Sequence, residues 1–399
     1  MPLKAADVGG LEVTNVVDGV GGVIGFTRSL NKMYKEQFEK SVQELMAYEN
    51  ERKRGKIGCI IYDVFMYFAQ SVADQFMIPG ICLRTSCAAS ILGITATHTP
   101  QERGFNMPVH VPIESLVQVP ELKALELGKV AEHLNELNAA VATAFNKSIA
   151  IIVNTMGFLE WAAINKAQEY FKATVYPIGP FHLYAENTNK SNSLLNEDPT
   201  CIAWLNQHPP RSVLYVSFGS LASMSEKDLL ETATGLVQSN QPFLWVIRPK
   251  MVIGGRCWAE ILPRDLIERI EETGLVVSWA PQRQVLGHGS IGGFWTHCGW
   301  NSTIEGVCEG VPMICKPFFG DQFWNAKYIT KVWKIGIEIE NEIERVNVER
   351  IIKELMVGEK GKEMRKRAMD LKDKVELCYK DGGTSYKYVD QLVELIASF

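Results

Sequence analysis

Residues 279–322 read WAPQRQVLGHGSIGGFWTHCGWNSTIEGVCEGVPMICKPFFGDQ, and this stretch brings together several side chains that suit a nucleotide ligand. Trp279 offers an indole face on which an aromatic base can stack. His297 follows the apolar run 292–295 and precedes a glycine that opens a helix. Backbone N–H groups at such a helix start are unpaired, so together with the ring N–H they favour a diphosphate as ligand.

Glu305 extends this pattern along the predicted helix. It lies four residues after Asn301 and eight after His297, hence on the same helix face one and two turns further on. A carboxylate only accepts hydrogen bonds, which suits the paired hydroxyls of a ribose. Taken singly, a core tryptophan, a surface histidine and a solvated acid are the neutral alternatives. Their occurrence together favours a binding site.

The same window resembles, almost position for position, the signature box of the plant family 1 (secondary-product) UDP-glycosyltransferases. The resemblance implies that the base and ribose are contacted by Trp279, Ala280, Gln282 and Glu305. It likewise implies contacts to the diphosphate from Ser220, His297, Asn301 and Ser302, and to the hexose from Trp300, Asp321 and Gln322. In that family glutamine at the last position is usually linked to glucose, so the expected donor is UDP-glucose.

The resemblance also implies an α/β fold of the GT-B type, with two facing Rossmann-like domains and the first lacking its opening β-α-β. The predicted domains are an acceptor-binding domain over residues 1–190, a UDP-sugar-binding domain over 191–380, and a C-terminal helix over 381–399 that packs back on the first domain. The polar stretch 184–198, rich in Asn and Ser, is the best linker candidate.

The residue pattern alone predicts parallel sheets covered by helices, because short β-branched runs alternate with amphipathic segments of helix length. Strands are predicted at 57–62, 81–83, 149–153, 213–217, 243–247, 275–277, 292–295, 311–314 and 335–339. Ser225, with Asp228 three residues later, predicts a capping-box helix start. Near the C-terminus one helical face is predicted for Tyr386, Val389, Leu392, Val393 and Ile396.

In the family, a histidine deprotonates the acceptor hydroxyl and an aspartate orients that histidine. Segment 60–68, IIYDVFMYF, resembles the strand end that carries the aspartate, so Asp63 is the candidate catalytic residue. Thr85 matches a family position that touches the sugar. Taken alone, Asp63 has a simpler alternative, which is a cap on the helix that follows.

The partner histidine is missing upstream of Asp63, because the first of the seven histidines is His98. Three explanations remain open, in this order: an incomplete gene model or splice form, a protein that binds UDP-sugar without turnover, or an enzyme with another base. His98 and His110 follow Thr85, and nothing in the sequence places either beside Asp63.

Residues 19–25, GVGGVIG, follow the strand-like run 11–17 and offer a competing interpretation, the glycine turn of a dinucleotide-binding oxidoreductase. That fold needs an acidic residue at the end of a second strand about 20 residues later. Here residues 30–54 form a charged, helix-like stretch instead. The glycines are therefore predicted to form a flexible loop.

Composition narrows the function classes. At 399 residues the chain exceeds one ordinary core, which predicts two domains. A net charge of −5 without a cationic block argues against nucleic acid as a partner. Nine scattered cysteines, an odd number without C-x-x-C, predict reduced thiols in a cytoplasmic protein. No signal peptide, membrane span or Asp-x-Asp metal motif is found, so a metal-independent monomer is expected.

The resulting hypothesis is a UDP-glucose-dependent, inverting O-glycosyltransferase. Its acceptor is expected to be a small lipophilic hydroxylated molecule such as a phenolic, flavonoid or terpenoid. The competing hypothesis is a catalytically impaired UDP-sugar-binding pseudoenzyme, or an incomplete gene model, that lacks the general-base histidine.

Overall fold

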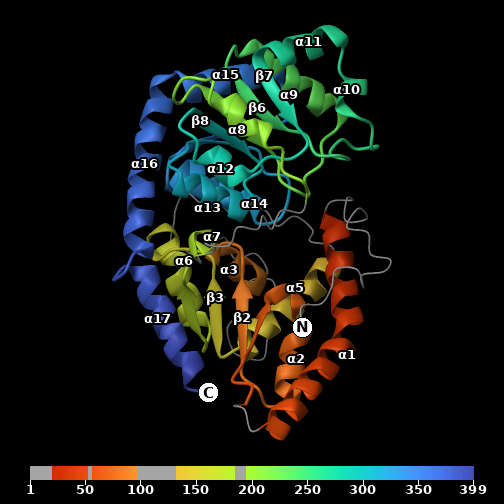
Figure 1. Cartoon of the computed structure of the whole chain (residues 1–399), viewed down its shortest axis with the longest axis vertical. Helices are drawn as coiled ribbons and strands as arrows, with labels where there is room; N and C mark the ends of the chain where they lie inside the picture. Colours follow the sequence, from red (N-terminus) through yellow and green to blue (C-terminus); the bar gives the residue numbers. More distant parts are fainter. Residues whose placement is uncertain (1–19, 53–55, 97–131, 185–194) are drawn as a thin grey trace. The chain divides into compact units, whose positions relative to one another are not determined.

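The computed structural model describes residues 20–52, 56–96, 132–184 and 195–399. The chain forms two compact units: unit 1, Met1–Gly179 together with Asp381–Phe399, and unit 2, Pro180–Lys380. Each unit contains one parallel sheet with helices packed on it (Figure 1). The predicted strand-like run 11–17 and most of the predicted linker lie outside the described residues.

The described sheet of unit 1 has the order β1-β2-β3-β4, with every pair parallel. Its strands are β1 Ile60–Asp63, β2 Gly80–Arg84, β3 Ala150–Val153 and β4 Thr174–Pro177. The first three confirm predicted strands, whereas β4 was not predicted. All four residues of β3 are buried, as expected of an inner parallel strand covered on both faces. The helices of this unit are α1 Val20–Arg52, η3 Val64–Met66, α2 Phe68–Gln75, α3 Ala88–Ala96, α5 Glu132–Lys147, α6 Gly157–Tyr170 and α17 Thr384–Ala397.

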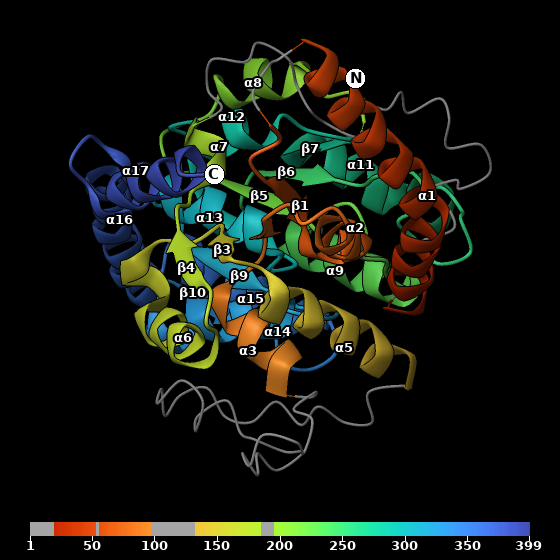
Figure 2. The ribbon, with the colours of Figure 1, turned by 90° about the horizontal axis from the view of Figure 1, so that it is seen from below.

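Helix α1 corrects the prediction of a flexible glycine loop, because residues 20–25 form its first turns. Contacts further along α1 hold it in place beside α2 (Figure 1, Figure 2). Asn31 donates to the Phe65 carbonyl oxygen at 2.7 Å and accepts from the Phe68 N–H at 3.0 Å. Phe38 packs edge-on against Phe68 with ring centroids 5.6 Å apart. Tertiary packing thus overrides the weak helix propensity of glycine.

A buried carboxylate sets the start of α3. Glu160, only 1% exposed, accepts from the backbone N–H of Ala88 at 2.9 Å and of Ala89 at 3.1 Å. Its own backbone leaves helical geometry inside α6, at φ −134° and ψ 35°. A carboxylate at a helix N-terminus accepts from backbone N–H groups that have no partner within the helix, and its negative charge interacts favourably with the helix dipole. The contact therefore fixes the loop after β2 that carries Thr85.

Helix α17 packs on β4, with Tyr176 and Tyr388 edge-to-face at 6.4 Å between ring centroids. The predicted apolar face is partly wrong. Leu392 is buried, but Tyr386 and Val393 are exposed, and Ser385 is buried in their place. The buried face of α17 is thus narrower than its apolar face.

The sheet of unit 2 has the order β10-β9-β8-β5-β6-β7, again with every pair parallel. Its strands confirm all six predictions and are β5 Val213–Ser217, β6 Phe243–Val246, β7 Gly274–Val277, β8 Ile291–Thr296, β9 Met313–Cys315 and β10 Gly336–Glu338. From β5 the chain builds outward to β7, then returns to lay β8 on the other side of β5. In such sheets ligands bind at the carboxyl ends of the strands at this reversal point.

Helices pack on the sheet of unit 2 (Figure 1). The helices of unit 2 are α7 Phe181–Tyr184, α8 Thr200–Leu205, α9 Glu226–Gln238, α10 Trp258–Ile261, α11 Arg264–Thr273, α12 Gln282–Leu286, α13 Trp300–Cys308, α14 Gln322–Lys327, η5 Tyr328–Val332, α15 Arg345–Met356 and α16 Glu359–Tyr379. Helix α9 begins with the predicted capping box of Ser225 and Asp228. Trp245 and Trp295, both fully buried, anchor a core beneath α9 and α15.

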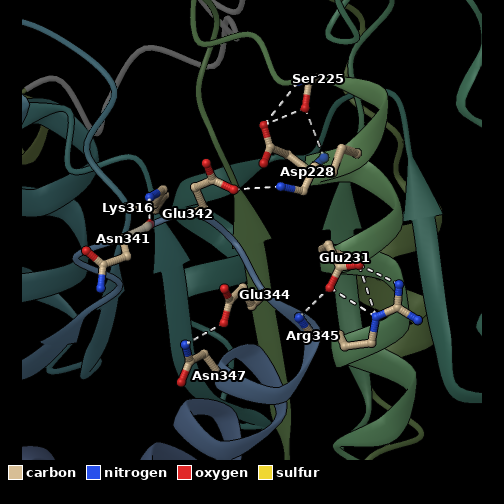
Figure 3. A network of polar contacts seen from close by, with 10 residues as sticks. Ser225, Asp228, Glu231, Lys316, Asn341, Glu342, Glu344, Arg345 and Asn347 are labelled. Atoms are coloured by element: carbon tan, nitrogen blue, oxygen red, sulfur yellow. Dashed lines mark hydrogen bonds and ion pairs between the residues drawn. The ribbon is translucent and has the colours of Figure 1, made fainter.

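An ion pair joins α9 to the start of α15 (Figure 3). Glu231 accepts from the backbone N–H of Arg345 at 2.6 Å and from Nε of the same residue at 3.0 Å, with a further contact from Nη2. The side-chain hydrogen bond of Arg345 lowers the pKa of Glu231 below its usual value. Bidentate arginine–carboxylate geometry is the strong form of this contact.

We predict a pH-dependent contribution of Glu231 to stability. A carboxyl whose pKa is lower in the folded chain stabilises it above the unfolded-state pKa, about 4.3, and this stabilisation is lost as pH falls through the folded-state pKa. Glu231→Gln should therefore lower Tm by a few degrees at neutral pH and by progressively less in acid. Glu271→Gln, at an exposed position on α11, is the control. A Tm difference that stays constant from neutral to acid pH would contradict the assignment.

Candidate functional site

The carboxyl edge of the unit 2 sheet gathers most of the predicted site residues. Ser217 of β5 lies opposite Thr296 of β8 at the reversal point. Beyond these ends the chain carries Ser220 after β5 and His297 after β8, and the remaining predicted positions follow β7, β8 and β9. The segment 279–322 thus returns several times to the same edge of this sheet.

His297 lies between two glycines. A Cβ added to Gly219, whose φ is +70°, would lie 2.5 Å from Cε1 of the imidazole, and one added to Gly299 would lie 2.3 Å from Nε2. Heavy-atom contacts this short do not occur, so both positions must lack a side chain for the ring to stay where it is. The two glycines therefore position the histidine.

The environment of His297 keeps its ring neutral. Burial lowers the pKa of His297 to about 4, and the charge of Arg248 acts in the same direction, whereas Asp321 and the backbone of Ser217 oppose the shift. At neutral pH one ring nitrogen then donates and the other accepts. Nδ1 is buried and makes no hydrogen bond with any residue in the described ranges. A buried polar atom of this kind is suited to a ligand.

The turn from β8 into α13 presents the helix start. Cys298 takes φ +63°, unusual for a residue with a side chain, and its N–H donates to Oγ1 of Thr296 at 3.1 Å. Its carbonyl oxygen accepts from Nδ2 of Asn325 at 2.9 Å, which also donates to Oδ2 of Asp321 at 3.1 Å. No side chain of the described residues caps α13 at Gly299. Backbone N–H groups at such a helix start favour an anion.

A hydrogen-bonded cluster joins α12 to α13. Nε2 of Gln282 donates to Oε2 of Glu305 at 2.6 Å and to Oγ of Ser302 at 3.0 Å, while Oε1 of Gln282 accepts from the Tyr215 hydroxyl at 3.2 Å. Burial raises the pKa of Glu305, and the hydrogen bond from Gln282 and the charge of Arg283 oppose this. Three predicted residues from two helices, α12 and α13, thus lie in direct contact.

The other predicted residues are placed as follows. Trp279 is half-buried, and its carbonyl oxygen accepts from the Asp198 N–H at 2.9 Å. Ala280 is buried. Asn301 is exposed on the first turn of α13, whereas Trp300 is only 3% exposed and packs against Trp333 with ring centroids 6.2 Å apart. Among these positions Trp300 contributes mainly to the core.

Gln322 is fixed in one orientation. Its Oε1 accepts from the backbone N–H groups of Phe318 at 2.8 Å and Phe319 at 3.1 Å. Because two backbone donors identify the oxygen, the other amide atom is the nitrogen. Gln322 therefore presents a donor next to Asp321, which can accept.

Sequence reasoning missed Arg248, which follows β6 and is only 7% exposed. Its guanidinium donates from Nη2 to the Ala222 carbonyl oxygen at 2.6 Å and from Nε to that of Gly219 at 3.3 Å. Burial lowers the pKa of this guanidinium. Arg248 braces the turn that holds Ser220 and adds positive potential near His297. Its position just past a strand end was the available signal.

The carboxyl edge of the unit 1 sheet carries Asp63 and Thr85. Oδ1 of Asp63 accepts from the Phe65 N–H at 2.9 Å and so caps η3, the simpler of the two predicted roles. No hydrogen bond or ion pair between Asp63 and a histidine is present among the described residues; His98 and His110 lie outside them. Thr85 is half-buried beside Arg84, a 5% exposed cation that donates to Oγ of Ser90 at 3.1 Å.

The described residues contain no group of three or more His, Cys, Asp or Glu side chains arranged to hold a metal ion. None of their helices combines the length and apolar character needed to cross a membrane.

Comparison with known proteins identifies relatives over most of the chain. A family model described as UDP-glucoronosyl and UDP-glucosyl transferase matches residues 26–374. UDP-glycosyltransferase 76E4 of Arabidopsis thaliana is 41% identical over 383 residues, covering 94% of this chain and 83% of that protein.

Solved structures agree with these relatives. Phytolacca americana UGT2, complexed with UDP-2fluoro-glucose and pterostilbene, superposes with a TM-score of 0.71 at 30% identity, over 90% of this chain and 80% of that one. Os79 from O. sativa in complex with UDP gives a TM-score of 0.77 at 25% identity, over 98% and 87% of the two chains. The predicted Rossmann-like, GT-B type fold is confirmed by these two similarities. This chain belongs to the UDP-glycosyltransferases, enzymes that transfer a sugar from a UDP-sugar donor.

Proposed function

We propose that the chain is a UDP-glucose-dependent, inverting O-glycosyltransferase acting on a small lipophilic hydroxylated acceptor. The observation that carries this proposal is the contact of Gln282 with Glu305 and Ser302, on the helix whose first turn follows His297. This arrangement offers partners for a ribose and a diphosphate within two turns of one helix.

The uridine is assigned to the segment that follows β7. The Trp279 indole stacks on the base, with a contribution of roughly 1–3 kcal/mol, while Ala280 and Gln282 line the base and ribose. Glu305 accepts from the ribose hydroxyls. Among the described contacts, the Glu305 side chain accepts one hydrogen bond, from Nε2 of Gln282 to Oε2, so the carboxylate retains acceptor capacity. Hydroxyl donors would also favour the ionised form that burial disfavours.

The diphosphate is assigned to the start of α13. A neutral His297 donates one N–H, Asn301 and Ser302 add side-chain donors, and Ser220 approaches from the turn after β5. The helix dipole and Arg248 supply positive potential. The same groups would stabilise charge on the departing UDP, which is how preorganised dipoles assist bond cleavage.

The hexose is assigned to Asp321, Gln322 and Trp300 of unit 2. The fixed amide donor of Gln322 and the acceptor Asp321 match alternating sugar hydroxyls. Glucose is supported by the UDP-2fluoro-glucose complex of Phytolacca americana UGT2, and a small phenolic acceptor by the pterostilbene in that complex.

Attack of the acceptor oxygen on the anomeric carbon, opposite UDP, inverts the configuration and needs a base for the hydroxyl proton. Asp63 is the proposed participant in unit 1. Its described contact is with its own 3₁₀ helix, which favours a second candidate function, binding of UDP-sugar without turnover.

We predict UDP release when UDP-glucose is mixed with hydroxylated phenolics, flavonoids or terpenoids. Calorimetric binding of UDP, measured in parallel, distinguishes the two candidate functions. Binding with acceptor-dependent release supports the transferase. Binding without release for every acceptor supports the silent binder, and absence of binding contradicts both.

The donor assignments predict that His297→Ala and Glu305→Ala each weaken UDP binding at least tenfold, equivalent to about 1.4 kcal/mol. Asp63→Asn lies in the other unit and should leave UDP affinity unchanged while reducing any turnover. The measurement is calorimetric titration with UDP. Equal affinities for all three variants would remove the donor-site assignment.

The close packing of the His297 ring against glycine predicts a second effect on UDP affinity. Gly299→Ala places a methyl 2.3 Å from Nε2 and must displace the imidazole, so UDP affinity should fall about as far as in His297→Ala. Gly289→Ala is a matched control, because a Cβ there meets nothing within 4 Å. If both alanine variants bind UDP like the parent chain, the position of the ring does not matter for the donor.

A further inference from the structure

A basic pocket lies at the opposite edge of the unit 2 sheet from the donor residues. It encloses about 220 Å³ and is lined by Arg211, Lys362, Arg365, Lys366 and Met369. Arg211 precedes β5, and its N–H donates to the Gly289 carbonyl oxygen at 2.9 Å. Nη2 of Arg365 donates to the Gly292 carbonyl oxygen at 3.0 Å, near the start of β8. His297 follows the far end of β8, roughly 17 Å away at about 3.3 Å per residue.

The positive charge of this pocket is largely uncompensated. Within the described ranges, no ion pair with a carboxylate is found for Arg211, Arg365 or Lys366. Lys362 contacts Glu359 at 2.7 Å, but both side chains are well exposed, and such surface pairs contribute little. The neighbouring Glu363 pairs with Arg367 instead. Four cations therefore share one cavity with a single weak counter-charge.

Arg365 carries the clearest sign of a missing partner. Its Nε is buried and makes no hydrogen bond with any residue that the structure describes. Burial lowers its pKa, and the nearby charge of Arg211 lowers it further, so the two guanidinium groups repel each other. Buried donors and charges are normally paired in folded proteins. An anion between the two guanidinium groups would satisfy both.

We propose that this pocket binds a phosphoryl group, separately from the donor site. Guanidinium groups present forked donors that match a tetrahedral oxyanion, and two lysines supply the further charge that a phosphate dianion balances. Free phosphate and a phospholipid headgroup share this chemistry. The inference does not rest on the proposed acceptor or on turnover.

Met369 provides a local probe of the pocket. In protein labelled with ¹³C at the methionine methyls, phosphate should shift the Met369 signal in a saturable way, whereas chloride at equal ionic strength should not. Met369→Leu assigns the signal, and the Met313 methyl, buried in β9, is the internal reference. Cosedimentation with phosphatidylcholine vesicles, with and without phosphatidic acid, tests the lipid source.

Arg211→Ala combined with Lys366→Ala should weaken phosphate or vesicle binding at least tenfold. Lys360→Ala, an exposed lysine on the same helix outside the pocket, should not. UDP affinity should be unchanged in both variants, which separates this site from the donor site and reports correct folding. Response to phosphate identifies a free anion, and response to acidic vesicles alone identifies a lipid. The proposal is overturned if neither is bound, or if the double variant binds as well as the parent chain.

Discussion

The imidazole of His297 lies between the backbones of Gly219 and Gly299, and the proposed donor site depends on that placement. The two glycines come from turns that follow neighbouring strands, β5 and β8, at the point where the order of strand addition reverses. The register of Ser217 with Thr296 brings the turns together. A change in that register would separate the histidine from the glycine turn and from the start of α13 at once.

Positive potential at this edge does not come from a charged histidine. Burial holds His297 neutral, and the fixed charge is supplied by Arg248 and the dipole of α13. Arg248 is itself stabilised by the carbonyl oxygens of Gly219 and Ala222 rather than by a carboxylate. This leaves its charge uncancelled, as an anionic ligand requires.

Sequence reasoning identified the strands of unit 2 and, among the predicted site residues, the contacting set Gln282, Ser302 and Glu305, since strand periodicity and the window 279–322 are local signals. It failed where tertiary contacts decide. The glycines of residues 20–25 became helix because α1 is held by Asn31 and Phe38 against the η3–α2 segment. Arg248 and Asn325 donate hydrogen bonds to backbone carbonyl oxygens of turns that are distant in the sequence. No spacing in the sequence predicts such partners.

Asp63 shows why a donor-binding site is easier to predict from sequence than a catalytic residue. A donor site recognises a ligand through many groups, so the loss of one signal leaves the others. A general base is one atom, whose role depends on what lies within hydrogen-bond distance. Asp63 has Oδ1 on the Phe65 N–H, a contact any strand-to-helix aspartate makes, and orienting a histidine would fall to its second oxygen. Capping by one oxygen and orientation of a histidine by the other are thus compatible roles for one carboxylate.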